Sequence, residues 1–243
     1  MFGTSAGAAG AGGTATAGKA GAGPLTCEQF HKPFPALKRI ADSTVRRLSL
    51  YLRFLEDFEA KGLATISSTE LAARGGTTSA QVRKDLSFFG SFGKRGLGYS
   101  VPELERRLRR ILGLEREWRV VIIGAGKIGL ALAQYGGFRE RGFKILAIYD
   151  EDPSKIGRKV DGLSVRAMTD LPRDAAKQTA DIAVLTVPGA AAQQVADVVV
   201  AAGVRAVMNF APVQLAVPGH VTVKDVNMAM ELEGLSFALT NQG

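Results

Sequence analysis

The sequence is poor in cysteine and histidine and contains no long apolar run. Cys27 is the single cysteine among 243 residues, which excludes an intrachain disulfide and a metal site built from several cysteines. The two histidines, His31 and His220, are too few and too isolated for a zinc centre. No segment approaches the roughly 20 apolar residues that span a bilayer, and the N-terminus lacks the features of a signal peptide. We therefore expect a cytoplasmic protein that binds no metal and no membrane.

The excess of positive charge lies in the N-terminal half of the chain. Residues 1–117 carry 18 Lys and Arg against 11 Asp and Glu, whereas residues 118–243 carry 13 against 12. A basic half beside a nearly neutral half indicates that one module meets a polyanion and that the other has a different role. The predicted divisions are a disordered Gly/Ala-rich arm (1–35), a DNA-binding domain (36–117), a nucleotide-binding domain (118–225) and a C-terminal helix (226–243).

The basic half has the pattern of a winged helix-turn-helix domain. Apolar residues at helical spacing predict a first amphipathic helix over 41–61. Capping boxes at Ser67–Glu70 and Thr78–Gln81 predict two short helices joined by a glycine turn. The segment 88–101 alternates apolar and aromatic residues around a basic, glycine-rich tip, which predicts a hairpin.

The second short helix is the candidate recognition helix. Its segment 79–85 offers a polar, basic face, whereas Val82 and Leu86 are expected to pack inward. Gln81 and Arg83 have donors that suit base edges, although a solvated side chain is the alternative for each. A glycine-rich basic tip suits a minor groove. The candidate DNA-binding residues are Ser79, Gln81, Arg83, Lys84, Lys94, Arg95 and Gly96.

The second half predicts a Rossmann-type parallel sheet. Short apolar runs alternate with helix-length segments, a pattern typical of parallel strands that are covered on both faces. The predicted strands are 120–123, 145–149, 182–187, 206–210 and 221–223. The fold class is therefore α/β, with an N-terminal winged-helix domain and a C-terminal Rossmann-type domain.

A glycine motif follows the first of these strands. Its residues are Gly124, Ala125, Gly126, Lys127, Ile128 and Gly129. In such a motif the first glycine permits the tight turn, the second lets the backbone approach a pyrophosphate, and the third lets helix and strand pack closely. The next strand ends at Asp150, where a carboxylate can bind the hydroxyls of an adenosine ribose. The motif and the aspartate together predict a dinucleotide site.

Two alternatives for this domain remain open. Asp150 favours NAD over NADP, but Lys155, Arg158 and Lys159 follow closely and weaken that preference. A small dehydrogenase would need a catalytic acid or base and room for a substrate domain, and His220 is better interpreted as a surface-turn residue. A related sheet that binds an acyl-CoA is the other alternative. We expect NADH and NAD⁺ as ligands and no enzyme activity.

Five blocks of sequence resemble the Rex family of redox-sensing transcriptional repressors, over about residues 37–240. They are QVRKDLSFFGSFGKRGLGY at 81–99, VVIIGAGKIGLALAQY at 120–135, VLTVP at 184–188, NFAP at 209–212 and GLSFAL at 234–239. The resemblance implies a homodimer that binds inverted-repeat operator DNA as a repressor and is released by NADH, with NAD⁺ competing. It also implies that the C-terminal helix, near residues 228–239, is exchanged between subunits.

The resemblance also implies roles for individual residues. Gly124, Gly126 and Gly129 would bind the pyrophosphate, Asp150 the ribose, and Thr186, Val187 and Pro188 the adenosine side. Tyr135, Asn209, Phe210 and Ala211 would lie toward the nicotinamide.

One position departs from the family pattern. The family commonly has an aspartate before the C-terminal helix, expected to pair with an arginine of the first helix, and this chain has Asn227 and Arg53 at those positions. An asparagine carries no charge that could respond to the oxidised nicotinamide ring. We therefore expect weaker discrimination between NADH and NAD⁺ than in an aspartate-bearing relative.

Overall fold

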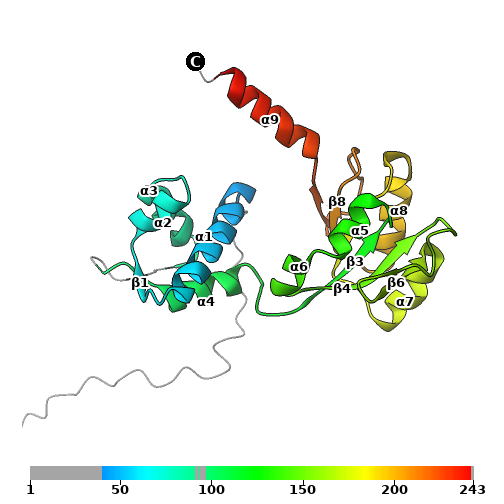
Figure 1. Cartoon of the computed structure of the whole chain (residues 1–243), viewed down its shortest axis with the longest axis horizontal. Helices are drawn as coiled ribbons and strands as arrows, with labels where there is room; N and C mark the ends of the chain where they lie inside the picture. The colour runs from blue at the N-terminus through cyan, green and yellow to red at the C-terminus, as the bar shows by residue number, and fades with distance from the viewer. Residues whose placement is uncertain (1–39, 91–92, 94–96, 242–243) are drawn as a thin grey trace, which may run out of the picture. The chain divides into compact units, whose positions relative to one another are not determined.

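The computed structural model describes residues 40–90, 93 and 97–241 (Figure 1). The chain divides into two units, Met1–Asp42 and Ser43–Gly243, and almost all described residues belong to the second. The predicted arm and the tip residues Lys94, Arg95 and Gly96 lie outside the described residues. In the described part of the chain, no helix combines the length and the apolarity needed to cross a lipid bilayer.

The N-terminal part of the described chain consists of short helices and one small sheet. Its elements are α1 (Asp42–Ala60), β1 (Thr65–Ile66), α2 (Ser68–Arg74), α3 (Ser79–Ser87), β2 (Tyr99–Ser100) and α4 (Val101–Ile111). β1 and β2 pair antiparallel, with Ile66 opposite Tyr99. The apolar faces of the helices form one core, which includes Leu48, Leu52, Leu71, Val82, Leu86 and Leu104. This arrangement confirms the predicted helix-turn-helix pattern.

The two predicted capping boxes differ in the structure. At the start of α2, the Ser67 side chain accepts from the Glu70 N–H and the Glu70 carboxylate accepts from the Ser67 N–H, which is a complete box. At the start of α3, Thr78 accepts from the Gln81 N–H. The Gln81 side chain, however, donates to Asp85 and does not return to the cap. The second predicted box is therefore half formed.

The predicted hairpin over 88–101 also differs from the structure. Phe88 is the C-terminal cap of α3, and β2 pairs with β1, which precedes the recognition helix in the sequence. Among the described residues, the segment has no second strand of its own opposite β2. The alternating pattern of this segment is that of a strand, β2, but the partner strand β1 lies earlier in the sequence and not in the same hairpin.

Asp85 joins α3, the candidate recognition helix, to α1. Its side chain is fully buried, and its carboxylate accepts from Arg47 at 2.6 and 2.8 Å, from the Tyr51 hydroxyl at 3.1 Å and from Gln81 at 2.8 Å. Burial alone would raise the pKa of Asp85, but these hydrogen bonds outweigh that effect and hold the pKa below its ordinary value. Removing one partner of a buried ion pair costs about 3–5 kcal/mol, so this contact fixes how α3 is presented.

The second part of the chain forms a seven-stranded sheet in the order β5-β6-β4-β3-β7-β8-β9. The strands are β3 (Trp118–Ile123), β4 (Phe143–Asp150), β5 (Lys159–Val160), β6 (Leu163–Ala167), β7 (Ile182–Leu185), β8 (Ala206–Asn209) and β9 (Thr222–Asp225). All neighbours pair parallel except β5 and β6. The direction of strand order reverses between β3 and β7, as in a doubly wound Rossmann-type fold. The predicted parallel sheet is confirmed.

Helices cover both faces of this sheet (Figure 1). The helices are α5 (Lys127–Ala133), α6 (Gly136–Glu140), α7 (Leu171–Lys177) and α8 (Gly189–Ala201), and a 3-10 turn, η2 (Met168–Asp170), precedes α7. One apolar core joins α7 and α8 to residues such as Val121 and Ala147, and a second core joins α5 to Val120 and Ile148. β5 and β6 were not predicted, because β5 has only two residues and β6 lacks the continuous apolar run by which the other strands were identified.

The last helix, α9 (Met228–Thr240), is apolar but buries none of its residues. Met228, Met230, Leu232, Leu235, Phe237 and Leu239 are each between 62% and 72% exposed. Contiguous exposed apolar surface of this kind marks an interaction site. The predicted C-terminal helix is confirmed, and its apolar residues have no partners among the described residues of this chain.

Candidate dinucleotide and nucleic-acid sites

A tight turn follows β3 at Gly124. The residue has φ of 105°, a conformation that L side chains rarely adopt, and its N–H donates to the Tyr149 carbonyl at 2.7 Å. A Cβ at Gly124 would lie 2.7 Å from the Thr186 carbonyl oxygen. The turn therefore requires glycine for conformation and for space.

Gly129 is required for a different reason. A Cβ at Gly129 would lie 1.9 Å from the Gly124 carbonyl oxygen, so α5 packs directly against the turn. The Thr186 hydroxyl donates to the same carbonyl at 2.8 Å and thereby joins β7 to the turn. The close packing of helix and strand expected from the glycine motif is present.

Gly126 has no such structural role. Its φ is −82°, which any residue adopts, and a Cβ there would meet nothing within 4 Å. The fold therefore explains the first and third glycines of the motif but not the second. An open backbone position beside a cavity is what a closely approaching phosphate group needs.

Asp150 lies at the end of β4 and is 9% exposed. Its carboxylate accepts from the N–H of Ala125 at 2.7 Å, the N–H of Asp152 at 2.8 Å and Lys155 Nζ at 3.1 Å. Burial alone would raise the pKa of Asp150, but these donors outweigh it and hold the pKa below its ordinary value. The carboxylate is thus ionised and fixed at the edge of the glycine turn.

A cavity of about 380 Å³ lies beside the turn, within the usual size range of ligand pockets. Its lining is Ile123, Gly124, Gly126, Asp150, Glu151, Lys155, Met168, Thr186, Val187, Pro188, Ala191 and Val195. Six of the predicted cofactor residues, Gly124, Gly126, Asp150, Thr186, Val187 and Pro188, are brought together in it.

The remaining predicted cofactor residues lie outside this cavity. Ala125 is buried and contributes its N–H to Asp150, whereas Lys127 and Ile128 are exposed at the start of α5. Tyr135 is 58% exposed and lines another cavity, together with Phe138 and Phe143.

The block of residues after β8 is also separate from the cavity. Asn209 is fully buried: its amide donates to Val213 O and to Asp225 Oδ1, each at 2.8 Å, and its oxygen accepts from the Ala211 N–H. Its side chain holds the ends of β8 and β9 together. Phe210 is half-buried and Ala211 is buried. Their predicted approach to a nicotinamide remains a prediction.

The candidate recognition helix α3 exposes part of its predicted face. Val82 and Leu86 are buried as expected, and Arg83 and Lys84 are exposed. Arg83 Nη1 donates to Ser68 Oγ at 3.0 Å, which leaves further guanidinium donors. Gln81 is half-buried and uses one amide N–H on Asp85. Arg83 and Lys84 are therefore better placed than Gln81 to contact DNA, and Ser79 is half-buried at the helix start.

The predicted switch pair is not joined within this chain. Arg53 and Asn227 are both exposed, and no hydrogen bond links them in the described residues. The Asn227 oxygen instead accepts from the N–H groups of Ala229 at 3.0 Å and Met230 at 3.3 Å and caps α9.

Two side-chain contacts beside the candidate sites were missed in the sequence. Asp85 was placed on the polar face of its helix, but its spacing from Val82 and Leu86 puts it on the buried face. Lys155 was treated as a nearby charge, whereas it forms an ion pair with Asp150. Among the described residues, no three His, Cys, Asp or Glu side chains are grouped so that they could hold a metal ion.

Two family models match the chain. One, described as a putative DNA-binding protein N-terminus, matches residues 39–87, which contain α1 to α3. The other, described as a CoA binding domain, matches residues 115–213, which contain β3 to β8. The models therefore separate the helix-turn-helix from the parallel sheet, as the apolar cores do.

Curated relatives match over most of their length. The redox-sensing transcriptional repressor Rex of Desulfitobacterium hafniense is 47% identical over 199 residues, which cover 82% of this chain and 95% of the relative. The redox-sensing transcriptional repressor Rex of Streptomyces griseus is 45% identical over 207 residues, covering 85% of this chain and 82% of the relative.

Solved structures agree with these relatives. A crystal structure of RSP, a Rex-family repressor, matches with a TM-score of 0.78 and 36% identity, covering 84% of this chain and 96% of that chain. RSP in complex with NADH matches with a TM-score of 0.77 and 35% identity, covering the same shares. RSP in complex with NAD⁺ and operator DNA matches with a TM-score of 0.80 and 36% identity, covering 84% and 94%.

The geometry of the glycine turn predicts a large loss of stability for one alanine substitution and a small change for another. Gly129→Ala forces a side chain against the Gly124 carbonyl and should destabilise the unliganded protein by about 1–3 kcal/mol or more. Gly126→Ala meets open space and should change stability by less than about 1 kcal/mol. Urea unfolding of both variants measures the difference, and equal destabilisation would contradict the distinction between the glycines.

Proposed function

Because the chain belongs to the Rex family of redox-sensing transcriptional repressors, we propose that it binds operator DNA as a homodimer and is released when NADH binds its sheet domain. The observation that carries this proposal is the open position at Gly126 beside the ionised Asp150. The fold does not require glycine at that position, and a ligand with phosphate and ribose groups does. The RSP complexes with NADH, and with NAD⁺ and operator DNA, support the same ligands.

The environment of Asp150 favours NADH over NADPH and CoA as the ligand. NADPH and CoA each carry a phosphate on the adenosine ribose, and a carboxylate beside that ribose repels it. Lys155 could offset this repulsion, but its ammonium already lies 3.1 Å from Asp150 Oδ2. The pair has little positive charge left for a further phosphate. We therefore expect CoA and NADPH to bind more weakly than NADH.

The DNA contacts are assigned to α3. Arg83 can address a base edge or a phosphate, and Lys84 a phosphate, from a helix that Asp85 anchors to α1. Ser79 and Gln81 complete the proposed contact face, and Lys94, Arg95 and Gly96, outside the described residues, are proposed as further DNA contacts. A regulator that binds DNA in this way belongs in the cytoplasm of a bacterium.

We assign the contact with the second copy of the chain to α9. Six large apolar side chains of this helix are exposed, and burying each of them would contribute about 1.5–3 kcal/mol. A homodimer in which the two copies exchange α9 provides that burial. It also presents two recognition helices to the two halves of an inverted repeat.

The sheet domain is proposed to sense the dinucleotide without chemical turnover. The titratable residues that line the cavity are Asp150, Glu151 and Lys155. Asp150 and Lys155 are paired with each other, and the low pKa of Asp150 makes it a poor proton donor. NADH is expected to remain unconsumed in solutions of the protein.

NADH releases operator DNA by shifting the populations of two conformations of the dimer. NADH acts by binding more tightly to a dimer whose recognition helices do not match successive major grooves than to one whose helices do. Reversing a 99:1 preference for the DNA-competent state would take about 5.5 kcal/mol, which two NADH sites per dimer could share.

The proposal predicts that NADH releases operator DNA at much lower concentration than NAD⁺. Fluorescence anisotropy of a labelled inverted-repeat operator at fixed salt measures this for the natural protein and for Gly126→Ala. The variant should bind operator normally and need at least about tenfold more NADH for release, since its methyl group occupies the space assigned to phosphate. Tight operator binding that is indifferent to both nucleotides would contradict the proposal.

Asn227→Asp tests the proposed switch pair. Aspartate also caps helices, so the variant should keep α9 intact while adding a charge that can pair with Arg53 of the second copy. The ratio of NADH to NAD⁺ affinity should then change, because a carboxylate interacts with the cationic ring of NAD⁺ and not in the same way with the neutral ring of NADH. An unchanged ratio, with α9 retained by circular dichroism, would reject this role.

A further inference from the structure

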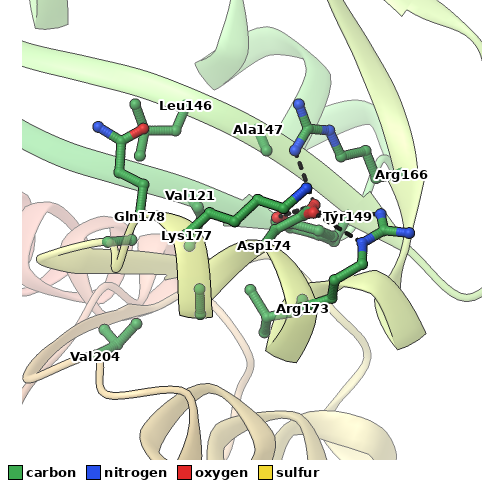
Figure 2. A pocket seen from close by; sticks show the side chains of 13 residues that line it. Val121, Leu146, Ala147, Tyr149, Arg166, Arg173, Asp174, Lys177, Gln178 and Val204 are labelled. Carbon is green, nitrogen blue, oxygen red and sulfur yellow. Dashed lines mark hydrogen bonds and ion pairs between the residues drawn. The ribbon is translucent and has the colours of Figure 1, made fainter.

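Another cavity lies between the sheet and α7 (Figure 2). Its volume is about 450 Å³, and it shares no lining residue with the dinucleotide cavity. Gln178 and Ala180 precede β7, and Val204 precedes β8, so the cavity extends toward the amino ends of these strands. The glycine turn lies at the carboxyl end of β3. At its charged end the cavity reaches Tyr149 on β4 and Arg166 on β6, near the carboxyl ends of these strands, so the two cavities are distinguished by their lining residues and not by the end of the sheet.

One end of this cavity is positively charged. Arg166, Arg173 and Lys177 point toward one another around Asp174 in Figure 2. Asp174 accepts from Arg166 at 2.8 Å and from Arg173 at 3.3 Å, and Arg173 also contacts Asp170 at 3.1 Å. Three cations face two carboxylates, so this end keeps a net positive charge.

The floor of the charged end is a fixed hydrogen-bond network. The Tyr149 hydroxyl donates to Asp174 at 3.1 Å, and burial raises the pKa of Tyr149 to about 12, so the hydroxyl stays protonated. The donors around Asp174 outweigh the effect of burial and hold its pKa below the ordinary value. The outer N–H groups of both arginines and the Lys177 ammonium remain donors for a further anion.

The other end of the cavity is apolar. Val121, Ala147, Leu171 and Val204 are buried side chains that form its wall, and Leu146 adds a half-buried one. Ligand pockets typically combine such a wall with a few convergent polar groups. A site with one cationic and one apolar end selects a molecule with the same division.

We propose that this cavity is a second binding site, which takes an organic carboxylate with a compact apolar body. The carboxylate lies against Lys177 and the two arginines, and the apolar body lies against the wall of Val121, Leu146 and Val204. The site is independent of the function proposed above, because it shares no residue with the dinucleotide cavity.

Isothermal titration calorimetry with 1-naphthoate as the probe tests the site in the full-length, NADH-saturated protein. The matched ligands are 1-naphthylmethanol, which has the same body without charge, and inorganic phosphate, which has charge without the body. The expected result is naphthoate binding that is at least about tenfold tighter than binding of either matched ligand. Equal binding of naphthoate and naphthylmethanol, or no detectable naphthoate binding to the NADH-saturated protein, would overturn the proposal.

Two variants and two controls locate the probe. Lys177→Gln should weaken naphthoate at least fivefold, and Lys159→Gln, on β5 outside the cavity lining, should leave it unchanged. Ala175→Leu adds volume to the lining and should abolish binding, whereas Ala176→Leu, on the exposed side of α7, should not. Thermal unfolding confirms that each variant is folded. Unchanged binding in both Lys177→Gln and Ala175→Leu would place the probe elsewhere and refute the site.

Discussion

The nucleotide-binding half depends on the close approach of α5, β3 and β7 at the glycine turn. The Gly124 carbonyl is so close to Gly129 that no side chain fits between them, and Thr186 donates to the same carbonyl. This packing places the Ala125 N–H on the Asp150 carboxylate, 2.7 Å away. The edge of the cavity and the position of the ionised aspartate are therefore tied to the packing of this turn. Gly126 stands beside it as the position that the fold leaves open.

The DNA-binding half has a corresponding constraint in Asp85. A fully buried carboxylate is tolerated because Arg47, Tyr51 and Gln81 donate to it, and losing Arg47 would leave a buried charge without its counter-ion. The network directs Val82 and Leu86 into the core and leaves Arg83 and Lys84 in solvent. Electrostatic satisfaction inside the domain thus determines which charges remain for a polyanion outside it.

Local patterns in the sequence predicted most of the fold. Helical spacing gave α1 within one residue at each end, and the glycine motif together with apolar runs gave the parallel sheet. Such local patterns could not predict pairing between distant segments, such as that of β2 with β1. The candidate dinucleotide site was predicted from local patterns too: the glycine motif indicated Gly124 and Gly129, and the end of the next strand indicated Asp150. The roles of Asp85 and Lys155 depend on the partners that tertiary folding brings to them.

The central claim is that dinucleotide binding and operator binding are coupled through one protein. Linkage requires the coupling to be reciprocal, so the most direct measurement is the Kd of NADH for the free protein and for the operator complex at the same salt concentration. The account predicts that NADH binds the operator complex about tenfold or more weakly, by the same factor with which NADH weakens operator binding. Equal NADH affinity in the two states would contradict it.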